Sequence, residues 1–274
     1  MVIDISHTLL HTLVKERPVD GHKGTFGHAL LVSGSYGMAG ACILAGKGCM
    51  RSGVGKLTIH TPRLNNDIIQ IALPEAIMHH DHDGNVWTCV LHPCSMYNAI
   101  GIGPGIGKHA KTAEALHETL IALQEENIPI VMDADALNLL AEHPEWSSLL
   151  PENTILTPHP LEYRRLMDAG FDMERLILVL KGHPTSICIP NSTDTYTCPF
   201  GNNGMGTAGS GDVLTGIILG LLAQGYTAKD AAILGVSLHA ISGDIAASEL
   251  GEHSLIASDL IKYLHKAFKQ MTIF

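Results

Sequence analysis

The sequence predicts an α/β fold built on a largely parallel sheet, and two observations carry this prediction. Short apolar runs alternate with longer segments of helical periodicity over residues 29–167, as in chains that build parallel sheets from strand–helix units. From residue 176, three short runs follow one another without an intervening helix, which indicates antiparallel strands at one edge. No linker, charge run or change of composition divides the 274 residues, so we expect one domain over residues 1–274.

Each expected element follows from a local pattern. Short apolar runs before a helix candidate or a Gly/Pro turn predict strands at residues 29–33, 56–60, 98–101, 128–132 and 154–156. Helical periodicity between them predicts helices at residues 39–51, 110–124, 136–141 and 161–167. Runs separated by Gly, Pro and Asn predict the antiparallel edge at residues 178–180, 185–189 and 195–198. Three helices complete the chain at residues 209–223, 228–250 and 257–269, and the second follows a Thr227 cap with Asp230 three residues later.

The composition excludes several classes of protein. Lys and Arg number 17 against 27 Asp and Glu, so the formal net charge of -10 opposes a nucleic-acid partner. Only 16% of the residues are charged and 28 are Gly, which suits a protein that contacts its ligand largely through backbone amides. The spacing of the 6 Cys residues matches neither a zinc site nor a redox motif, so we expect reduced, buried thiols.

The chain has no pattern typical of export or membrane insertion. Residues 1–14 contain no basic start, long apolar run or small-residue cleavage site. The most apolar stretch, residues 213–223, is shorter than the roughly 20 residues that cross a bilayer. We therefore expect a soluble, cytoplasmic protein.

A glycine-rich segment at residues 202–212 leads directly into an apolar helix. Its Gly residues leave the backbone free to turn N–H groups inward, and the helix that follows adds the positive end of its dipole. This pattern predicts an anion hole formed by Ala208, Gly209, Ser210 and Gly211. Asp212, in the first helical turn, is then placed to accept a proton from a hydroxyl that attacks a bound phosphoryl group. The alternative is that Gly211 and Asp212 only cap the helix.

Other nucleotide and hydrolase motifs fail on spacing. Gly48 and Leu57 stand where a P-loop requires Ser or Thr after its Gly-Lys pair. The loop at residues 101–107 has Ile106 where a dinucleotide-binding motif requires its third Gly, so close approach to a ligand and a plain βα turn both remain open. No Ser has the flanking glycines of a nucleophile elbow, which argues against an esterase.

Four polar residues end predicted strands, where open α/β sheets bind ligands. His159, between two prolines, contacts a polar substrate or is structural. Lys181 lies near nucleotide phosphates or on the surface. Asp133 and Asp135 could hold Mg2+ or polar substrate groups, and Asp135 could equally be a helix cap.

Two histidine groups look like metal sites but lack the required context. Residues 79–83 are neighbours in a predicted loop, and such neighbours rarely fix a coordination geometry. His7 and His11 have the i, i+4 spacing without the Glu of a metalloprotease motif. We interpret both groups as solvated surface.

The order of motifs resembles the ADP-dependent NAD(P)H-hydrate dehydratases over residues 23–250, nearly the whole chain. The motifs that carry the resemblance are Lys-Gly-Thr-Phe-Gly-His-Ala, Gly-Ser-Tyr-Gly-Met-Ala-Gly-Ala, Gly-Pro-Gly-Ile-Gly, Asp-Ala-Asp-Ala-Leu-Asn, Thr-Pro-His-Pro and Ala-Gly-Ser-Gly-Asp, at residues 23–29, 34–41, 103–107, 133–138, 157–160 and 208–212. The resemblance implies a ribokinase-like three-layer sandwich, with a mostly parallel central sheet, helices on both faces and an antiparallel edge.

The resemblance also implies an activity. ADP would phosphorylate the C6 hydroxyl of the S epimer of hydrated NADH or NADPH, elimination of phosphate would restore NAD(P)H, and AMP would leave. Mg2+ is implied as cofactor, with unidentified ligands, and a homotetramer as assembly. Eukaryotic relatives usually use ATP. Because about twenty residues precede Lys23, we expect no N-terminal epimerase domain.

Position by position, the resemblance assigns site residues. Ala41, Gly107, His159 and Asp212 would bind the substrate, with Asp212 at the reacting group. The nucleotide would be held by Lys181, Gly182, His183, Pro184, Thr185 and Gly211.

Two other functions are compatible with the anion hole. A small-alcohol kinase of the same fold, such as a hydroxyethylthiazole or hydroxymethylpyrimidine kinase, would accumulate a phosphorylated product, but the motifs at residues 23–29 and 157–160 fit it less well. A noncatalytic nucleotide sensor would bind AMP or a dinucleotide without turnover, which the intact Gly211-Asp212 pair argues against.

Overall fold

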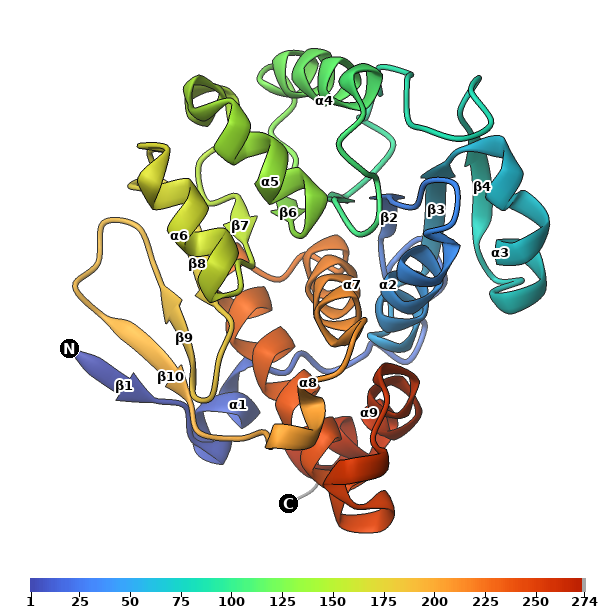
Figure 1. Cartoon of the computed structure of the whole chain (residues 1–274). Coiled ribbons are helices and arrows are strands. Elements are labelled where there is room, and N and C mark those ends of the chain that lie inside the picture. Colours follow the sequence, from blue (N-terminus) through green and yellow to red (C-terminus); the bar gives the residue numbers. More distant parts are fainter. Residues whose placement is uncertain (273–274) are drawn as a thin grey trace.

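The computed structural model describes residues 1–272 and has a ten-stranded sheet at its centre (Figure 1). Its strand order is β1-β10-β9-β8-β7-β6-β5-β2-β3-β4. The strands are β1 Val2–Asp4, β2 His28–Val32, β3 Lys56–Thr61, β4 Ile77–His80, β5 Ala99–Ile102, β6 Ile130–Met132, β7 Ile155–Leu156, β8 Ile177–Leu180, β9 Thr185–Cys188 and β10 Thr195–Cys198. Neighbours from β4 to β8 are parallel, β9 is antiparallel to β8 and β10, and β1 is parallel to β10. The mostly parallel sheet with an antiparallel edge is confirmed.

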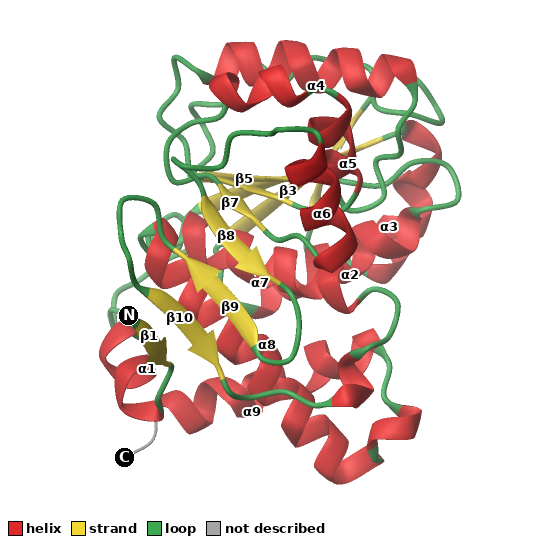
Figure 2. Cartoon of the chain, turned by 60° about the vertical axis from the view of Figure 1, so that its left-hand side comes forward, coloured by secondary structure: helices red, strands yellow, loops and turns green. Residues whose placement is uncertain are grey.

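Helices cover both faces of this sheet, so the three-layer sandwich is also confirmed (Figures 1 and 2). In β2, Leu31 packs into one core and Leu30 into the other, because successive side chains point to opposite faces. Helices α4, α5 and α6 share the core of Leu30, and α2, α7, α8 and α9 share the core of Leu31. The helices are α1 His7–Leu13, α2 Ala39–Arg51, α3 Asn66–Ala72, α4 Ala110–Leu123, α5 Asp135–Glu142, α6 Pro160–Asp168, α7 Ser210–Ala223, α8 Ala228–Leu250 and α9 Ala257–Thr272.

Helices α2 and α7 touch through their backbones. A Cβ at Gly216 would lie 1.9 Å from the carbonyl oxygen of Ala45, and one at Gly48 would lie 2.7 Å from that of Val213. Gly48, which ruled out a P-loop in the sequence, is therefore a packing residue inside a helix. The close contact fixes the first turn of α7 beside the sheet.

Helix α8 is long and apolar enough to cross a membrane, but 78% of its apolar window is buried inside the protein. Its start is the predicted one, since the Thr227 side chain accepts a hydrogen bond from the backbone N–H of Asp230 at 3.1 Å. We therefore describe α8 as a core helix of the sandwich.

Four elements were missed by the sequence patterns: β1, α1, α3 and β4. Strand β1 has three residues, α1 and α3 have seven each, and β4 carries two histidines on an exposed edge, so none shows a clear period. The surface interpretation of residues 79–83 holds for His79, His80 and His82 but is wrong for Asp81. The Asp81 carboxylate is buried and accepts hydrogen bonds from Thr88 and the ring of His60. His11 is half-buried, so the same interpretation is wrong there too.

Candidate active site

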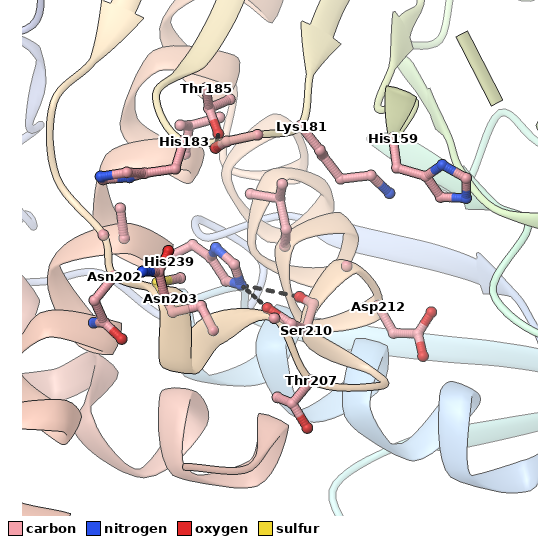
Figure 3. Close-up of a pocket in the computed structure, with 18 of the residues that line it drawn as sticks. His159, Lys181, His183, Thr185, Asn202, Asn203, Thr207, Ser210, Asp212 and His239 are labelled. Atoms are coloured by element: carbon pink, nitrogen blue, oxygen red, sulfur yellow. Dashed lines mark hydrogen bonds between the residues drawn. The ribbon is translucent and has the colours of Figure 1, made fainter. Parts of the chain in front are cut away.

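A cavity of about 540 Å³ opens where β6 and β8 end and α7 begins (Figure 3). This is the carboxyl edge of the parallel strands, where ligands bind in open α/β sheets. Its volume suits a small-molecule ligand. The predicted site residues that line it are His159, Lys181, Gly182, His183, Thr185, Ser210, Gly211 and Asp212.

The glycine-rich segment forms one end of the cavity. Gly209 precedes α7 in a left-handed conformation (φ +87°), and a Cβ there would lie 2.4 Å from the Leu44 side chain. Helix α7 therefore begins at Ser210, one residue later than predicted. The N–H groups of its first turn have no acceptor within the helix, and its dipole favours an anion. Of the four residues expected to form the anion hole, Ser210 and Gly211 line the cavity, whereas Ala208 and Gly209 are outside its lining.

Asp212 lies in this first turn and is largely withdrawn from solvent. Burial and the nearby Asp133 carboxylate raise its pKa to about 7, and the positive charge of Lys181 partly opposes the rise. A carboxyl group with a pKa near neutrality is suited to accept a proton during catalysis at that pH.

Lys181 belongs to a buried network and is not a surface lysine. Its Nζ lies 2.7 Å from Oδ1 of Asp133 and 3.9 Å from Oε2 of Glu162. Oδ2 of Asp133 accepts a hydrogen bond of 2.7 Å from the Thr215 hydroxyl. A Cβ at Gly211 would lie 3.1 Å from Lys181 Nζ, so glycine lets the ammonium group approach the start of α7. Because both oxygens of Asp133 are engaged, we interpret Asp133 as the ion-pair partner of Lys181 and not as a free metal ligand.

His159 combines the two alternatives that its sequence left open. Its Nδ1 accepts hydrogen bonds from the N–H groups of Leu161 and Glu162, and Oε2 of Glu162 accepts one from the His159 N–H. This capping box fixes the start of α6. The same imidazole lines the cavity, so it is also available to a ligand. Burial raises the pKa of Glu162, and Lys181 opposes that rise.

The remaining predicted residues lie outside the cavity. A Cβ at Gly105 would lie 3.1 Å from the Cβ of Ala41, so the loop after β5 packs on the first turn of α2. The N–H of Gly107 donates a 2.9 Å hydrogen bond to Oδ2 of Asp135. Asp135 is the first residue of α5 and Ala134 occupies the N-cap position, so Asp135 is not the cap. Since Asp135 also contributes to the raised pKa of Asp212, this loop lies within electrostatic range of the cavity. Pro184 is outside the lining as well.

Several polar contributors have no predicted role from the sequence, among them Glu162, Thr215, His239 and Asn202. Thr215 and His239 lie inside apolar helices, and Asn202 belongs to a loop in which only glycines were considered. Nε2 of His239 lies 2.9 Å from the carbonyl oxygen of Ser210 and 3.2 Å from its hydroxyl. Burial lowers the pKa of His239 to about 4, so the ring is neutral at pH 7. For Thr215 and His239, the signal in the sequence was a polar residue at a core position of an apolar helix. Such a residue has many structural explanations.

The side chains of the cavity are better suited to bind Mg2+ together with phosphates than to hold a metal ion by protein ligands alone. Within residues 1–272, no group of three or more His, Cys, Asp or Glu side chains is arranged to hold an ion. Asp212 and Glu162 nevertheless present carboxylates to the cavity. Mg2+ commonly uses one or two carboxylates together with substrate phosphates.

The mostly parallel sheet with helices on both faces, and a pocket at its carboxyl edge beside the start of α7, define a ribokinase-like fold. The chain belongs to the NAD(P)H-hydrate dehydratase family, whose sequence profile matches residues 29–266. It is 35% identical to an ADP-dependent (S)-NAD(P)H-hydrate dehydratase of Bacillus subtilis, over 93% of this chain and 94% of that one. It is 38% identical to a bifunctional NAD(P)H-hydrate repair enzyme of Coxiella burnetii, over 92% of this chain and 52% of that one. The chain thus spans about half the length of the bifunctional relatives it matches.

Solved structures agree with this assignment. An ADP/ATP-dependent NAD(P)H-hydrate dehydratase from Bacillus subtilis, co-crystallised with ATP and Mg2+, superposes with a TM-score of 0.83 at 32% identity, covering 97% of both chains. A ribokinase-like superfamily protein from Enterococcus faecalis gives 0.84 at 26% identity, covering 99% of this chain and 96% of that one. A hydroxyethylthiazole kinase from Pyrococcus horikoshii gives 0.59 at 13% identity, covering 89% of each chain, which shows the shared fold alone.

Proposed function

We propose that the protein catalyses the ADP-dependent dehydration of the S epimer of hydrated NADH and NADPH, releasing NAD(P)H, AMP and phosphate. The observation that carries the proposal is the Asp212 carboxyl group, with a pKa of about 7, at the anion-binding start of α7. A relative named for this activity aligns with 93% of the chain, which supports it. A small-alcohol kinase and a noncatalytic sensor have no comparable support.

The first step is a phosphoryl transfer for which Asp212 is the general base. Asp212 accepts the proton of the C6 hydroxyl while the hydroxyl oxygen bonds to the β-phosphorus of ADP. The bond from that phosphorus to the bridging oxygen breaks, and AMP leaves. The N–H groups that begin α7 and the ammonium group of Lys181 stabilise the negative charge on the transferred group.

The second step is an elimination. The C6–O bond breaks with loss of phosphate, a proton leaves C5, and the electron pair of that C–H bond forms the C5=C6 double bond. Hydroxide is a poor leaving group and phosphate a good one, so the earlier transfer makes this elimination possible. ADP and hydrated cofactor thus become AMP, phosphate and NAD(P)H.

The remaining residues complete the proposed site. Lys181–Thr185 and Gly211 bind the nucleotide, including His183 and Pro184, while Ala41, Gly107 and His159 bind the hydrated dinucleotide. Mg2+, held by Glu162 together with the phosphates, would neutralise phosphate charge. We also propose a single domain over residues 1–274, a cytoplasmic location and a homotetramer. Light scattering of the purified protein tests the homotetramer.

Recovery of NADH absorbance from its S-hydrate, with ADP and ATP assayed in parallel, tests the activity. We expect turnover with ADP, and a loss of about 10²–10⁴-fold in kcat for Asp212→Asn, because the amide cannot accept the proton. Asp168→Asn, at an exposed position on α6, is the matched control and keeps wild-type activity. No recovery by the wild type, full activity of Asp212→Asn, or a stable phosphorylated alcohol as product would each reject the proposal.

A further inference from the structure

One wall of the cavity is the loop that joins β10 to α7, residues 199–209. Phe200, Gly201, Asn202, Asn203, Met205, Gly206 and Thr207 of this loop all line the cavity. Most of the loop has no regular structure, so contacts with other elements contribute to its shape. Helix α8 supplies such contacts at three points.

The first contact is made by the Asp244 carboxylate at the start of the loop. Its Oδ2 accepts a 2.8 Å hydrogen bond from the N–H of Gly201, and its Oδ1 accepts a 2.9 Å hydrogen bond from the side-chain amide of Asn202. The side-chain oxygen Oδ1 of Asn202 in turn accepts a 3.0 Å hydrogen bond from the N–H of Gly204. A hydrogen bond to an ionised acceptor is stronger than one between neutral groups. Asp244 therefore orders consecutive residues of the wall.

The second contact is a notch in α8 that receives Met205. A Cβ at Gly243 would lie 2.3 Å from the sulfur of Met205 and 2.7 Å from its Cγ. A Cβ at Gly201 would lie 3.4 Å from the same sulfur. The Met205 side chain thus packs against α8 only because Gly243 lacks a side chain.

The third contact is at the end of the loop. His239, one turn before Gly243 on α8, holds Ser210 at the first residue of α7 (Figure 3). One helix therefore attaches the loop at its beginning, middle and end.

We propose that Asp244 is a positioning residue that holds the loop of residues 199–209 in its nucleotide-binding form, with Gly243 making the room for Met205. This inference rests on the proposed function, in which the cavity takes the nucleotide. A loop ordered before binding lowers the entropy cost that the nucleotide would otherwise bear. Asp244 acts through the loop and not on the reacting atoms, so its loss should affect binding more than turnover.

Asp244→Asn tests the first contact. The amide nitrogen or the neutral oxygen must now face the Gly201 N–H, so we expect faster hydrogen exchange at residues 200–204 and ADP affinity reduced about tenfold. The KM for ADP should rise by a similar factor, while kcat stays within about twofold. The matched control is Glu249→Gln, which makes the same chemical change on α8 but faces Tyr263 and Lys266 of α9. It should leave loop exchange and ADP affinity unchanged.

A double-mutant cycle tests the second contact. The variant should stay folded, because alanine has a higher helix propensity than glycine. Gly243→Ala should displace Met205 and weaken ADP binding by about fivefold to tenfold. In a Met205→Ala background the three atoms nearest the added methyl group, Sδ, Cγ and Cε of Met205, are gone, so the effect of Gly243→Ala should be much smaller. An equal effect in both backgrounds would contradict the role of the notch.

Hydrogen exchange separates this inference from the proposed function. If wild type shows no dehydratase activity but Asp244→Asn still loosens the loop and weakens ADP binding, the proposed function fails and the positioning role stands. Unchanged loop exchange in Asp244→Asn, equal changes in Glu249→Gln, or ADP binding that does not protect residues 200–206 of the wild type would each overturn the positioning role.

Discussion

Asp212 shows how one carboxyl group links function to stability. Its burial at the start of α7 and the neighbouring Asp133 carboxylate raise its pKa to about 7, from a reference value of 3.8. The same environment that makes it a useful base makes its charged form costly in the folded state. Its proton is bound more tightly in the folded protein than in the unfolded chain.

The sign of the pH dependence follows from this difference. Between about pH 4 and pH 7 the folded protein keeps a proton that the unfolded chain has released, so this group's contribution to stability declines as the pH rises through that window. Asn at position 212 has no proton to lose. We therefore expect Asp212→Asn to be more stable than wild type by about 2–4 kcal/mol at pH 8, with the difference vanishing near pH 4.

Urea unfolding of both proteins across this pH range measures the difference. Asp168→Asn, which replaces an exposed carboxylate, should track wild type throughout. A gain in stability of Asp212→Asn that is independent of pH would contradict the assigned titration.

At the scale of elements, the sequence predicted long periodic segments well and short ones poorly. The predicted helix at residues 39–51 agrees with α2 at both ends, and the strands at residues 29–33 and 56–60 agree with β2 and β3 within one residue. Helix α3 and strand β4 were missed because seven and four residues, with an edge strand rich in histidine, carry too little periodicity. The contact between α2 and α7 could not be predicted, because a glycine within a helix does not indicate which other helix packs against it.

That contact gives a prediction about packing. Gly216→Ala would place a methyl group 1.9 Å from the Ala45 carbonyl oxygen, so α2 and α7 must separate. We expect a loss of about 3 kcal/mol in the free energy of unfolding, greater than the gain in helix propensity. Gly40→Ala, on α2, adds a methyl group with no neighbour within 4 Å beyond its adjacent residues and the backbone of its own helix, and is the control.

Thermal unfolding distinguishes the two variants. Gly216→Ala should melt well below wild type, and Gly40→Ala at or slightly above it, since alanine gains up to about 1 kcal/mol in a helix. Equal melting temperatures would show that the interface between the two helices relaxes around an added methyl group.

At the scale of the whole molecule, a protein with a net charge of -10 is proposed to bind polyanions. In the cavity lining the carboxyl groups of Asp133, Glu162 and Asp212 offset the Lys181 ammonium group, so we expect the N–H groups in the first turn of α7 to supply most of the attraction for an anion. Lys181 is itself held by Asp133, so the positive charge at the cavity is fixed in place.

Ligand binding should therefore depend on the phosphates of the nucleotide. At a concentration 100 times its Kd, ADP stabilises a folded protein by about 2.7 kcal/mol, which for a chain of this size raises the melting temperature by about 5 °C. Adenosine at the same concentration lacks the phosphates and should give a much smaller shift. Equal shifts for ADP and adenosine would contradict an anion site at the start of α7.

The sequence by itself determined the fold class, the antiparallel edge, and the glycine-rich turn that places Asp212 at a helix start, because these depend on local periodicity and backbone conformation. Tertiary structure decided which groups meet. Lys181, Asp133 and Thr215 lie 34 or more positions apart in the chain, and Asp133 contacts the other two only because β6 and β8 end where α7 begins. The raised pKa of Asp212 and the attachment of its loop to α8 likewise arise from burial and contacts between distant segments, for which no local pattern exists.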